Sequence, residues 1–267
     1  MDVDADPDAD PEFEGAFFDI GGVLLDLSTV RDGYEAFLRR YAEREGIDDV
    51  EALIDDWKRA LGHYFRSREG TEYRTARAGY ARAIDLAVAA REGADLDALL
   101  AGEAEVERSI PESEWFPLFE AASDEHLEPT DGAVETVRAL DEAGFYLGII
   151  SDIDHWEAER MLDRFGLREF FDDVTTSEEV GRTKPDPEMF EVALSAASVD
   201  PGASVYVGDR YDHDMRGGSA AGLVTVAHGG TAAEQAEADP DRAVDYAVDD
   251  LRDLLDVVGV DRDGDRA

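Results

Sequence analysis

The sequence predicts an α/β fold, a doubly wound parallel sheet that carries an inserted α-helical cap. Three observations lead to this class. The stretch GAFFDIGGVLL, from Gly15, is a short apolar run broken by glycines, as in a buried strand followed by a turn. Residues from about 30 to 125 show only helical periodicity. Beyond residue 128, strands and helices alternate, which requires a parallel sheet with helices on both faces.

The inserted stretch places apolar residues at three- and four-residue spacing, the pattern of amphipathic helices. It does so in the segments YEAFLRRYAERE, VEALIDDWKRALGHYF and YARAIDLAVAA. Because the strand before it belongs to the same sheet as the strands after it, the stretch is an insertion into the α/β core.

The alternating region begins with a helix that has an aspartate near its start and a glycine at its end, TDGAVETVRALDEAG. Buried strands are then predicted at FYLGIISD, DDVTTS, SVYVGD and LVTVAHG. The helices between and after them are HWEAERMLDRFGL, DPEMFEVALSAA, HDMRGGSAAG and VDDLRDLLDVV. This order predicts a Rossmann-like core over residues 13–28 and 128–258, a cap over 29–127, and disordered acidic tails over 1–12 and 259–267.

Composition narrows the possible partners. The formal net charge is -41 over 267 residues, which disfavours binding to nucleic acid or to anionic lipid. Lysine occurs only at Lys58 and Lys184, and an acidic, lysine-poor surface is typical of salt-adapted cytoplasmic proteins; an ordinary acidic enzyme is the alternative. With no cysteine, no signal-like start and no apolar run of membrane-spanning length, we expect a soluble, cytoplasmic protein, either a monomer or a homodimer.

Polar residues follow the predicted strands at the edge where ligands of open parallel sheets bind. They are Asp19, Gly21 and Gly22 after the first strand, Ser151 and Asp152 after the second, Lys184 in the loop EVGRTKPDP, and Asp209, Asp212 and Asp214 after SVYVGD. Clustered carboxylates repel one another unless a cation joins them, and oxygen ligands of this charge suit Mg²⁺. The metal and the lysine would then attract a phosphate.

These residues give the chain its resemblance to the haloacid-dehalogenase-like hydrolase superfamily, in the branch with a helical cap after the first strand. Four motifs of that family have counterparts in order: FFDIGGVL at Asp19, GIIS at Ser151, a lysine at Lys184, and VGDRYDHD at Asp209 and Asp214. The resemblance implies Mg²⁺-dependent hydrolysis of a small phosphate monoester through an aspartyl-phosphate.

The resemblance also implies a role for each matching residue. Asp19 would be the nucleophile, assisted by Lys184 and Ser151. The metal would be held by Asp19, Gly21 (through its carbonyl), Asp209 and Asp214. Phosphoryl oxygens would be held by Gly21, Gly22, Ser151, Asp152 and Lys184. Asp214 is also a candidate to orient Lys184.

The chain departs from the family pattern at two positions. Phosphatases of the family carry a general acid two residues after the nucleophile, where this chain has Gly21; they often have asparagine where it has Asp152. Three outcomes stay open: another acid (Asp152, Asp154 or Asp212) takes the role, the substrate has a good leaving group, or strong phosphatase activity is lost.

Two alternatives follow from these departures. The chain could be a non-catalytic scaffold that binds a phosphorylated metabolite or a protein partner. Less favoured are haloacid hydrolysis and phosphonate hydrolysis, the latter needing a cap lysine, for which Lys58 is the candidate.

The cap contains one basic stretch, Trp57–Arg82, which has a local excess of arginine. We expect part of it, including Arg66 and Arg74, to overhang the site and attract an anionic substrate. Pairing of these arginines with cap acids such as Asp55 and Asp56 is the equal alternative.

Overall fold

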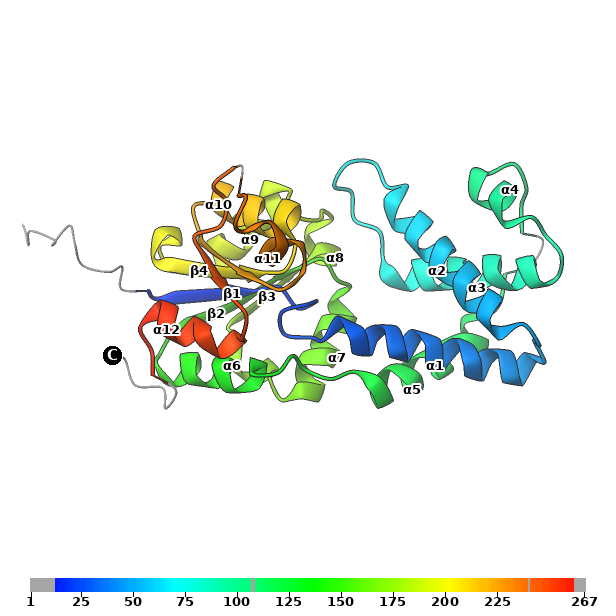
Figure 1. The fold of residues 1–267 in the computed structure, drawn as a ribbon, viewed down its shortest axis with the longest axis horizontal. Coiled ribbons are helices and arrows are strands. Elements are labelled where there is room, and N and C mark those ends of the chain that lie inside the picture. The colour runs from blue at the N-terminus through cyan, green and yellow to red at the C-terminus, as the bar shows by residue number, and fades with distance from the viewer. Residues whose placement is uncertain (1–12, 107–108, 240, 262–267) are drawn as a thin grey trace, which may run out of the picture.

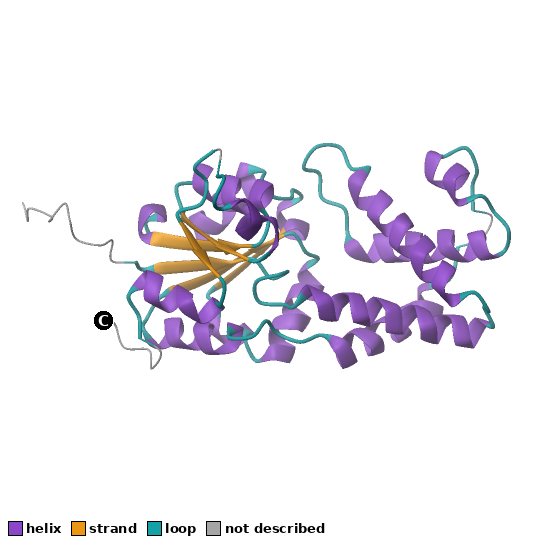
Figure 2. Cartoon of the chain, viewed as in Figure 1, coloured by secondary structure: helices purple, strands orange, loops and turns teal. Residues whose placement is uncertain are grey.

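A computed structural model describes residues 13–106, 109–239 and 241–261 of the chain. Within them, six strands form one parallel sheet in the order β3-β2-β1-β4-β5-β6, with helices on both faces (Figures 1 and 2). The strands are β1 (Gly15–Phe18), β2 (Tyr146–Ser151), β3 (Asp173–Thr176), β4 (Ser204–Gly208), β5 (Val224–His228) and β6 (Tyr246–Val248). The predicted fold class is confirmed, and the sequence analysis missed only the short edge strand β6 among these strands.

The central strand β1 is buried along its whole length, which explains why its sequence is continuously apolar rather than alternating. It pairs with β2 on one side and β4 on the other. Ala16 and Phe18 point into one hydrophobic core, and Phe17 into a second on the opposite face. Its carboxyl end therefore lies in the middle of the sheet, where Asp19 follows.

The core helices cover both faces of the sheet (Figure 1). On one side lie α6 (Ala133–Glu142), α7 (His155–Phe165) and α12 (Leu254–Val258); on the other lie α9 (Pro187–Ala196), α10 (Arg216–Ala220) and α11 (Gly230–Gln235). The helix α8 (Ser177–Val180) is a single turn after β3. Short turns of helix occupy Arg168–Phe170, Pro201–Ala203, Tyr211–Met215 and Leu251–Asp253.

In the described part of the chain, the first five of the helices between β1 and β2 form the cap, which extends away from the sheet (Figure 1). They are α1 (Leu27–Glu45), α2 (Val50–Arg66), α3 (Ala76–Arg91), α4 (Leu96–Ala101) and α5 (Glu112–His126). Asp26 caps α1 by accepting a hydrogen bond from the Ser28 amide at 2.8 Å. The cap has a hydrophobic core of its own, separate from those around the sheet and rich in aromatic rings such as Trp57, Trp115 and Phe119.

A cap segment is joined to the core above the sheet edge. Residues 66–75, which we call the cap loop, end α2 and lead into α3, and their backbone pairs with residues 181–183 of the core. The Tyr73 amide donates to the Gly181 carbonyl at 3.2 Å, and the Thr183 amide donates to the Thr71 carbonyl at 2.8 Å. The Thr71 hydroxyl also donates to Asp186 at 2.5 Å. The cap loop is thereby fixed beside the segment that carries Lys184.

The ends of the chain can be described in part. The predicted tail 1–12 and residues 262–267 of the second tail lie outside the described residues. Val260, which falls within the predicted second tail, is buried against the core. Within the described ranges, no helix combines the length and the apolar character that a membrane crossing requires.

Candidate active site

Asp19 lies at the carboxyl end of β1 and is 3% exposed. Its Oδ1 atom accepts hydrogen bonds from the Ser151 hydroxyl at 2.6 Å and from the Ile20 amide at 2.9 Å. Lys184 Nζ lies 3.0 Å from the same oxygen. Arg210 lies 3.8 Å from the other oxygen, Oδ2. One oxygen is therefore fixed, which leaves the other freer to act on a ligand.

Lys184 is completely buried and reaches the site from the segment that pairs with the cap loop. Its Nζ lies 2.7 Å from Asp214 Oδ1 and donates to the Ile150 carbonyl at 3.0 Å and to the Tyr206 hydroxyl at 2.7 Å. Burial opposes the charged form, but the two carboxylates outweigh it and raise the pKa of Lys184 above its ordinary value. The lysine is therefore a fixed ammonium between Asp19 and Asp214.

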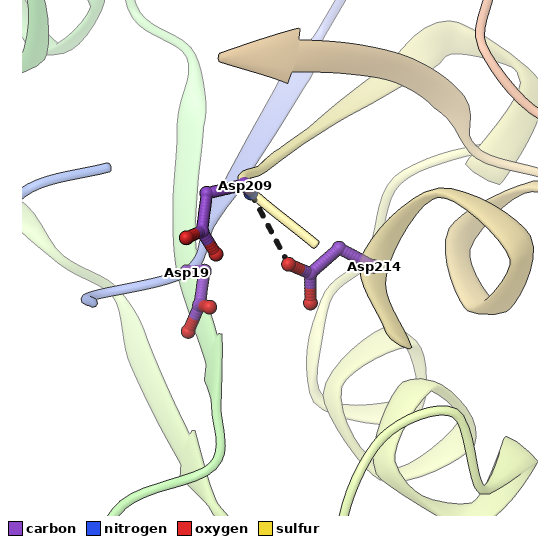
Figure 3. Close-up of side chains that lie close together, drawn as sticks. All are labelled: Asp19, Asp209 and Asp214. Atoms are coloured by element: carbon purple, nitrogen blue, oxygen red, sulfur yellow. Dashed lines mark hydrogen bonds between the residues drawn. The ribbon is translucent and has the colours of Figure 1, made fainter. Parts of the chain in front are cut away.

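Three carboxylates meet at this edge (Figure 3). Asp19, Asp209 and Asp214 offer oxygens that all lie within 4.8 Å of one another. Burial, together with Asp19 and Asp214, raises the pKa of Asp209 to about 7, and burial raises the pKa of Asp19. Burial acts the same way on Asp214, but Lys184 and Arg210 hold the pKa of that carboxyl below its ordinary value. Such mutual repulsion is what a hard divalent cation relieves, so the donor set fits Mg²⁺.

The two glycines after Asp19 differ in the space they leave. Gly22 has φ +79°, and a Cβ there would lie 2.5 Å from Asp209 Oδ2, so only glycine fits. Its amide donates to the Leu25 carbonyl at 2.9 Å. This engagement of the amide weighs against the phosphate contact of Gly22, which stays a prediction. The residue allows close approach of the loop to Asp209. Gly21 lines the cavity, and a Cβ there would meet nothing closer than Leu27 at 3.5 Å.

The partners of Asp152 also weigh against its predicted phosphate contact. Its Oδ1 accepts from the Lys184 amide at 2.8 Å and from the Ser177 hydroxyl at 2.9 Å, and its Oδ2 accepts from Arg210 at 2.9 Å. A carboxylate held this way repels a phosphate and cannot donate to it. Asp152 instead positions the Lys184 segment and Arg210.

The other acids considered as replacements at position 21 are also engaged. The buried carboxylate of Asp154 accepts from the Tyr73 hydroxyl, from the Thr75 hydroxyl at 2.5 Å and from the Ala76 amide at 2.7 Å. It thus caps the cap helix α3 from the core. Asp212 is an exposed residue that pairs with Arg216 at 3.3 Å.

The predicted cap lysine stands apart from the site. Lys58 Nζ lies 2.7 Å from Glu35 on a surface where the lysine side chain is 43% exposed. It does not line the cavity above Asp19. This placement weighs against Schiff-base chemistry at Lys58.

A cavity of about 640 Å³ lies between the cap and the sheet edge. Asp19, Ser151, Asp209 and Arg210 line its core side. On the cap side it is lined by Tyr34, Phe65, Arg66, Arg68, Tyr73, Arg74 and Tyr80. Its size suits a small ligand, and its walls come from both parts of the chain.

Two charged residues of the cavity were missed by the sequence analysis. Arg210 follows Asp209 directly. Desolvation opposes its charge, but three nearby carboxylates outweigh it and raise the pKa of Arg210, which is therefore a fixed cation beside Asp19. Glu157, on α7, is 7% exposed and accepts a long hydrogen bond from Tyr80 at 3.4 Å. Burial and Asp154 raise the pKa of Glu157 to about 7. Adjacency to the fourth motif could have identified Arg210, whereas nothing in the local sequence distinguishes Glu157 from a surface acid.

Comparison with curated proteins finds relatives that this chain resembles over about half of its length. It is 39% identical over 137 residues to a glyceraldehyde 3-phosphate phosphatase of Methanopyrus kandleri, covering 50% of this chain and 58% of the relative. It is 37% identical over 143 residues to the pyrophosphatase PpaX of Halalkalibacterium halodurans, covering 52% and 64%. The chain thus spans under two thirds of the length of either relative.

Solved structures match over nearly the whole fold. A 2-haloacid dehalogenase of Pseudomonas syringae superposes with a TM-score of 0.62 at 25% identity, covering 92% of this chain and 98% of that one. The HAD-hydrolase YfnB of Bacillus subtilis, solved bound to magnesium, superposes with a TM-score of 0.62 at 20% identity, covering 92% and 99%. The family model of haloacid dehalogenase-like hydrolases matches residues 13–222. Since that match takes in β1, the cap and the strand ends that carry the buried carboxylates, the chain belongs to the haloacid dehalogenase-like hydrolase family.

Proposed function

We propose that the protein is an Mg²⁺-dependent hydrolase of small phosphate monoesters that acts through Asp19. The observation that carries this proposal is the meeting of Asp19, Asp209 and Asp214 around one point, with Lys184 Nζ 3.0 Å from Asp19 and 2.7 Å from Asp214. The relatives named as phosphatases support the reaction class.

The contacts of Asp19 support one of its two oxygens as the attacking atom. Ser151, the Ile20 amide and Lys184 all contact Asp19 Oδ1, so Oδ2 is the oxygen available to form a bond to phosphorus. As that bond forms, the ester oxygen leaves and takes a proton from the solvent in the cavity. A water then attacks phosphorus, releases inorganic phosphate and restores the Asp19 carboxylate.

Asp19 and Asp209 would hold the magnesium ion through their side chains, with Asp214 contributing directly or through a water. When bound, the ion offsets the negative charge of the phosphoryl group. Lys184 and Arg210 add positive charge at the same place, and Asp214 fixes the lysine by its 2.7 Å contact. The Gly21 carbonyl remains the predicted backbone ligand.

The absent general acid decides which esters react fastest. Two of the acids considered as replacements, Asp152 and Asp154, are each held by several donors, which opposes a role in proton transfer. A general acid contributes about 10²–10⁴ in rate, so esters with poor leaving groups should be hydrolysed more slowly by about that factor. We therefore propose that substrates with stable leaving groups react best.

Mg²⁺-dependent phosphate release from p-nitrophenyl phosphate and from glyceraldehyde 3-phosphate tests the function. We expect activity that chelation removes and that Asp19→Asn lowers at least about a thousandfold. Asp212→Asn is the matched control, since it removes the same charge from an exposed residue paired with Arg216. Equal activity of Asp19→Asn and the wild-type protein would exclude Asp19 as the nucleophile.

Gly21 keeps a second candidate function open, a non-catalytic scaffold that binds a phosphorylated ligand in the same cavity. It predicts no turnover of any ester together with saturable, Mg²⁺-dependent binding. Calorimetry with the same two esters separates the candidates, because a scaffold gives stable binding heats without release of phosphate.

We also propose that the protein works in a salt-rich cytoplasm. The net charge of -41 and the presence of only two lysines support this setting. Salt screens the repulsion between the acidic residues of such a surface. The unfolding temperature should therefore rise between about 0.1 and 2 M KCl, over which the screening length falls from about 10 Å to under about 3 Å.

A further inference from the structure

The cationic residues of the cap fall into two groups. Most pair with carboxylates at the surface, as Arg39 does with Glu51 at 2.7 Å and Arg91 with Asp56 at 2.5 Å. Arg40, Arg44, Lys58, Arg59 and Arg77 are paired in the same way. By contrast, Arg66, Arg68 and Arg74 form no ion pair with any carboxylate of the described residues, in a chain with 66 acidic residues. Their positive charge is therefore left for another partner.

What separates these three arginines from other unpaired ones is their place. Arg31 and Arg82 also lack an ion pair within the described part of the chain, but they do not line the cavity above Asp19. Arg66, Arg68 and Arg74 all line it. Pairing with cap acids, the alternative left open by the sequence, holds for part of the basic stretch, since Arg59 pairs with Asp56 at 3.8 Å. Among the described residues it does not hold for the three arginines that line the cavity.

The cap loop that carries these arginines is built as a fixed element. It pairs with residues 181–183 through Thr71 and Tyr73, next to Lys184. Arg74 is committed to this structure, because its guanidinium donates to the Tyr64 carbonyl at 2.9 Å and to the Ser67 carbonyl at 3.1 Å. Arg66 is exposed and Arg68 half-buried, and no described acceptor is recorded for either guanidinium. These two guanidinium groups are the donors that remain for a ligand.

We propose that Arg66 and Arg68 form a second anion site, which binds an oxyanion on the part of the substrate that is not transferred. This inference rests on the proposed phosphate hydrolysis and names its substrate class: a phosphate ester or anhydride with a carboxylate or a second phosphate. A guanidinium offers a planar pair of donors that matches either group. The acidic core wall of the cavity, with Asp19 and Asp209, would otherwise repel a second negative charge.

Substrates of similar size that differ in the second group test the proposal. We compare glycerol 3-phosphate (neutral remainder), 3-phosphoglycerate (carboxylate) and diphosphate (second phosphate), each with Mg²⁺. The wild-type protein should show a KM at least about tenfold lower for one or both doubly anionic compounds than for glycerol 3-phosphate. KM is compared rather than kcat, because the better leaving group of diphosphate raises kcat by itself. Which of the two is preferred identifies the source of the oxyanion.

The double variant Arg66→Gln/Arg68→Gln should raise KM about tenfold for the preferred compound and less than about twofold for glycerol 3-phosphate. Arg82→Gln is the matched control, since it removes an exposed, unpaired cap arginine outside the cavity, and it should leave both values within about twofold. An equal loss for all three compounds in the double variant would overturn the proposal in favour of general attraction of anions.

Binding to Asp19→Asn separates failure of this proposal from failure of the proposed function. Calorimetry of this variant with 3-phosphoglycerate, diphosphate and glycerol 3-phosphate reads the second anion site without turnover. Selective binding of a doubly anionic compound that is lost when Arg66→Gln/Arg68→Gln is added supports the site even if no ester is hydrolysed. Hydrolysis of glycerol 3-phosphate with no selectivity in either assay would keep the function and overturn the site.

Discussion

The two lysines of the chain lie in its two halves, and they show how differently the core and the cap treat charge. Lys184, in the core, is completely buried between Asp19 and Asp214. Lys58, in the cap, is 43% exposed and pairs with Glu35 on the surface. In the core, desolvated charges converge on one point and depend on one another, whereas most cap ion pairs lie in water around an aromatic interior. A buried cation of this kind indicates a reactive site, and an exposed one does not.

Removing each lysine is the strongest test of this contrast. Lys184→Met leaves Asp19 and Asp214 buried without their cation, so we expect a loss of about 3–5 kcal/mol in the free energy of unfolding. Lys58→Met should cost no more than about 1 kcal/mol, because its pair is solvated. Denaturant unfolding of both variants measures the difference. Similar losses of unfolding free energy in the two variants would mean that the buried charges of the core depend on one another no more than the exposed ion pairs of the cap do.

Placing an acid at position 21 tests whether the core site lacks a proton donor. Gly21→Asp should fit, because a Cβ at this position meets nothing closer than Leu27 at 3.5 Å. We expect kcat for a poor leaving group such as glycerol 3-phosphate to rise by about 10²-fold, within the range of general acid catalysis. Gly22→Asp is the contrasting variant and should lose activity, since its side chain would collide with Asp209. A Gly21→Asp protein that folds and gains nothing would show that proton transfer does not limit the reaction.

The contact between the two halves gives the next largest effect. Asp154→Asn keeps the size of the side chain but replaces one acceptor oxygen by an NH₂ group. This donor would face hydroxyl and amide groups that are themselves donors, so hydrogen bonds would be lost. We expect a loss of about 2 kcal/mol, with faster hydrogen exchange in residues 66–77 than in the sheet. Asp212→Asn serves as the exposed control. Uniform exchange changes across the chain would argue that Asp154 stabilises the whole fold rather than the cap contact.

The smallest effect concerns pH and Glu157. In the folded chain the pKa of Glu157 is raised to about 7 from 4.5, by burial first and Asp154 next, while Arg160 and Tyr80 oppose the shift. The folded state thus binds this proton more tightly than the unfolded state, so the contribution is complete below pH 4.5 and is lost as pH rises through 7. Glu157→Gln mimics the protonated form. It should be more stable than wild type by about 1–3 kcal/mol at pH 8 and equal to it at pH 4. Parallel stability curves for the two proteins would contradict this assignment.

The sequence predicted the core more fully than the cap for a physical reason. Core strands are buried on both faces and end in polar residues, so their pattern is visible in short segments such as the one before Asp19. The edge strand β6 has only three residues, with Tyr246 41% exposed, and it lacks that apolar signal. The helix α5 escaped identification as well, and it carries Pro117 in its interior.

Side-chain partners were the part that the sequence could not supply. The roles of Asp152 and Asp154 depend on Arg210 and on the cap loop, which come close only through the fold. An arginine such as Arg66 can pair with a neighbouring acid or face a cavity, depending on how its helix is rotated. The positions of charged residues along the sequence do not give that rotation.

The backbone pairing of Thr71 and Tyr73 with residues 181–183 has a consequence for how the cavity opens. The cap loop can leave the core on this side only if those hydrogen bonds break. The ammonium of Lys184 would stay in place, because Asp19, Asp214 and two other core groups hold it independently of the cap loop. Entry to the cavity and placement of the buried cation therefore depend on separate sets of contacts.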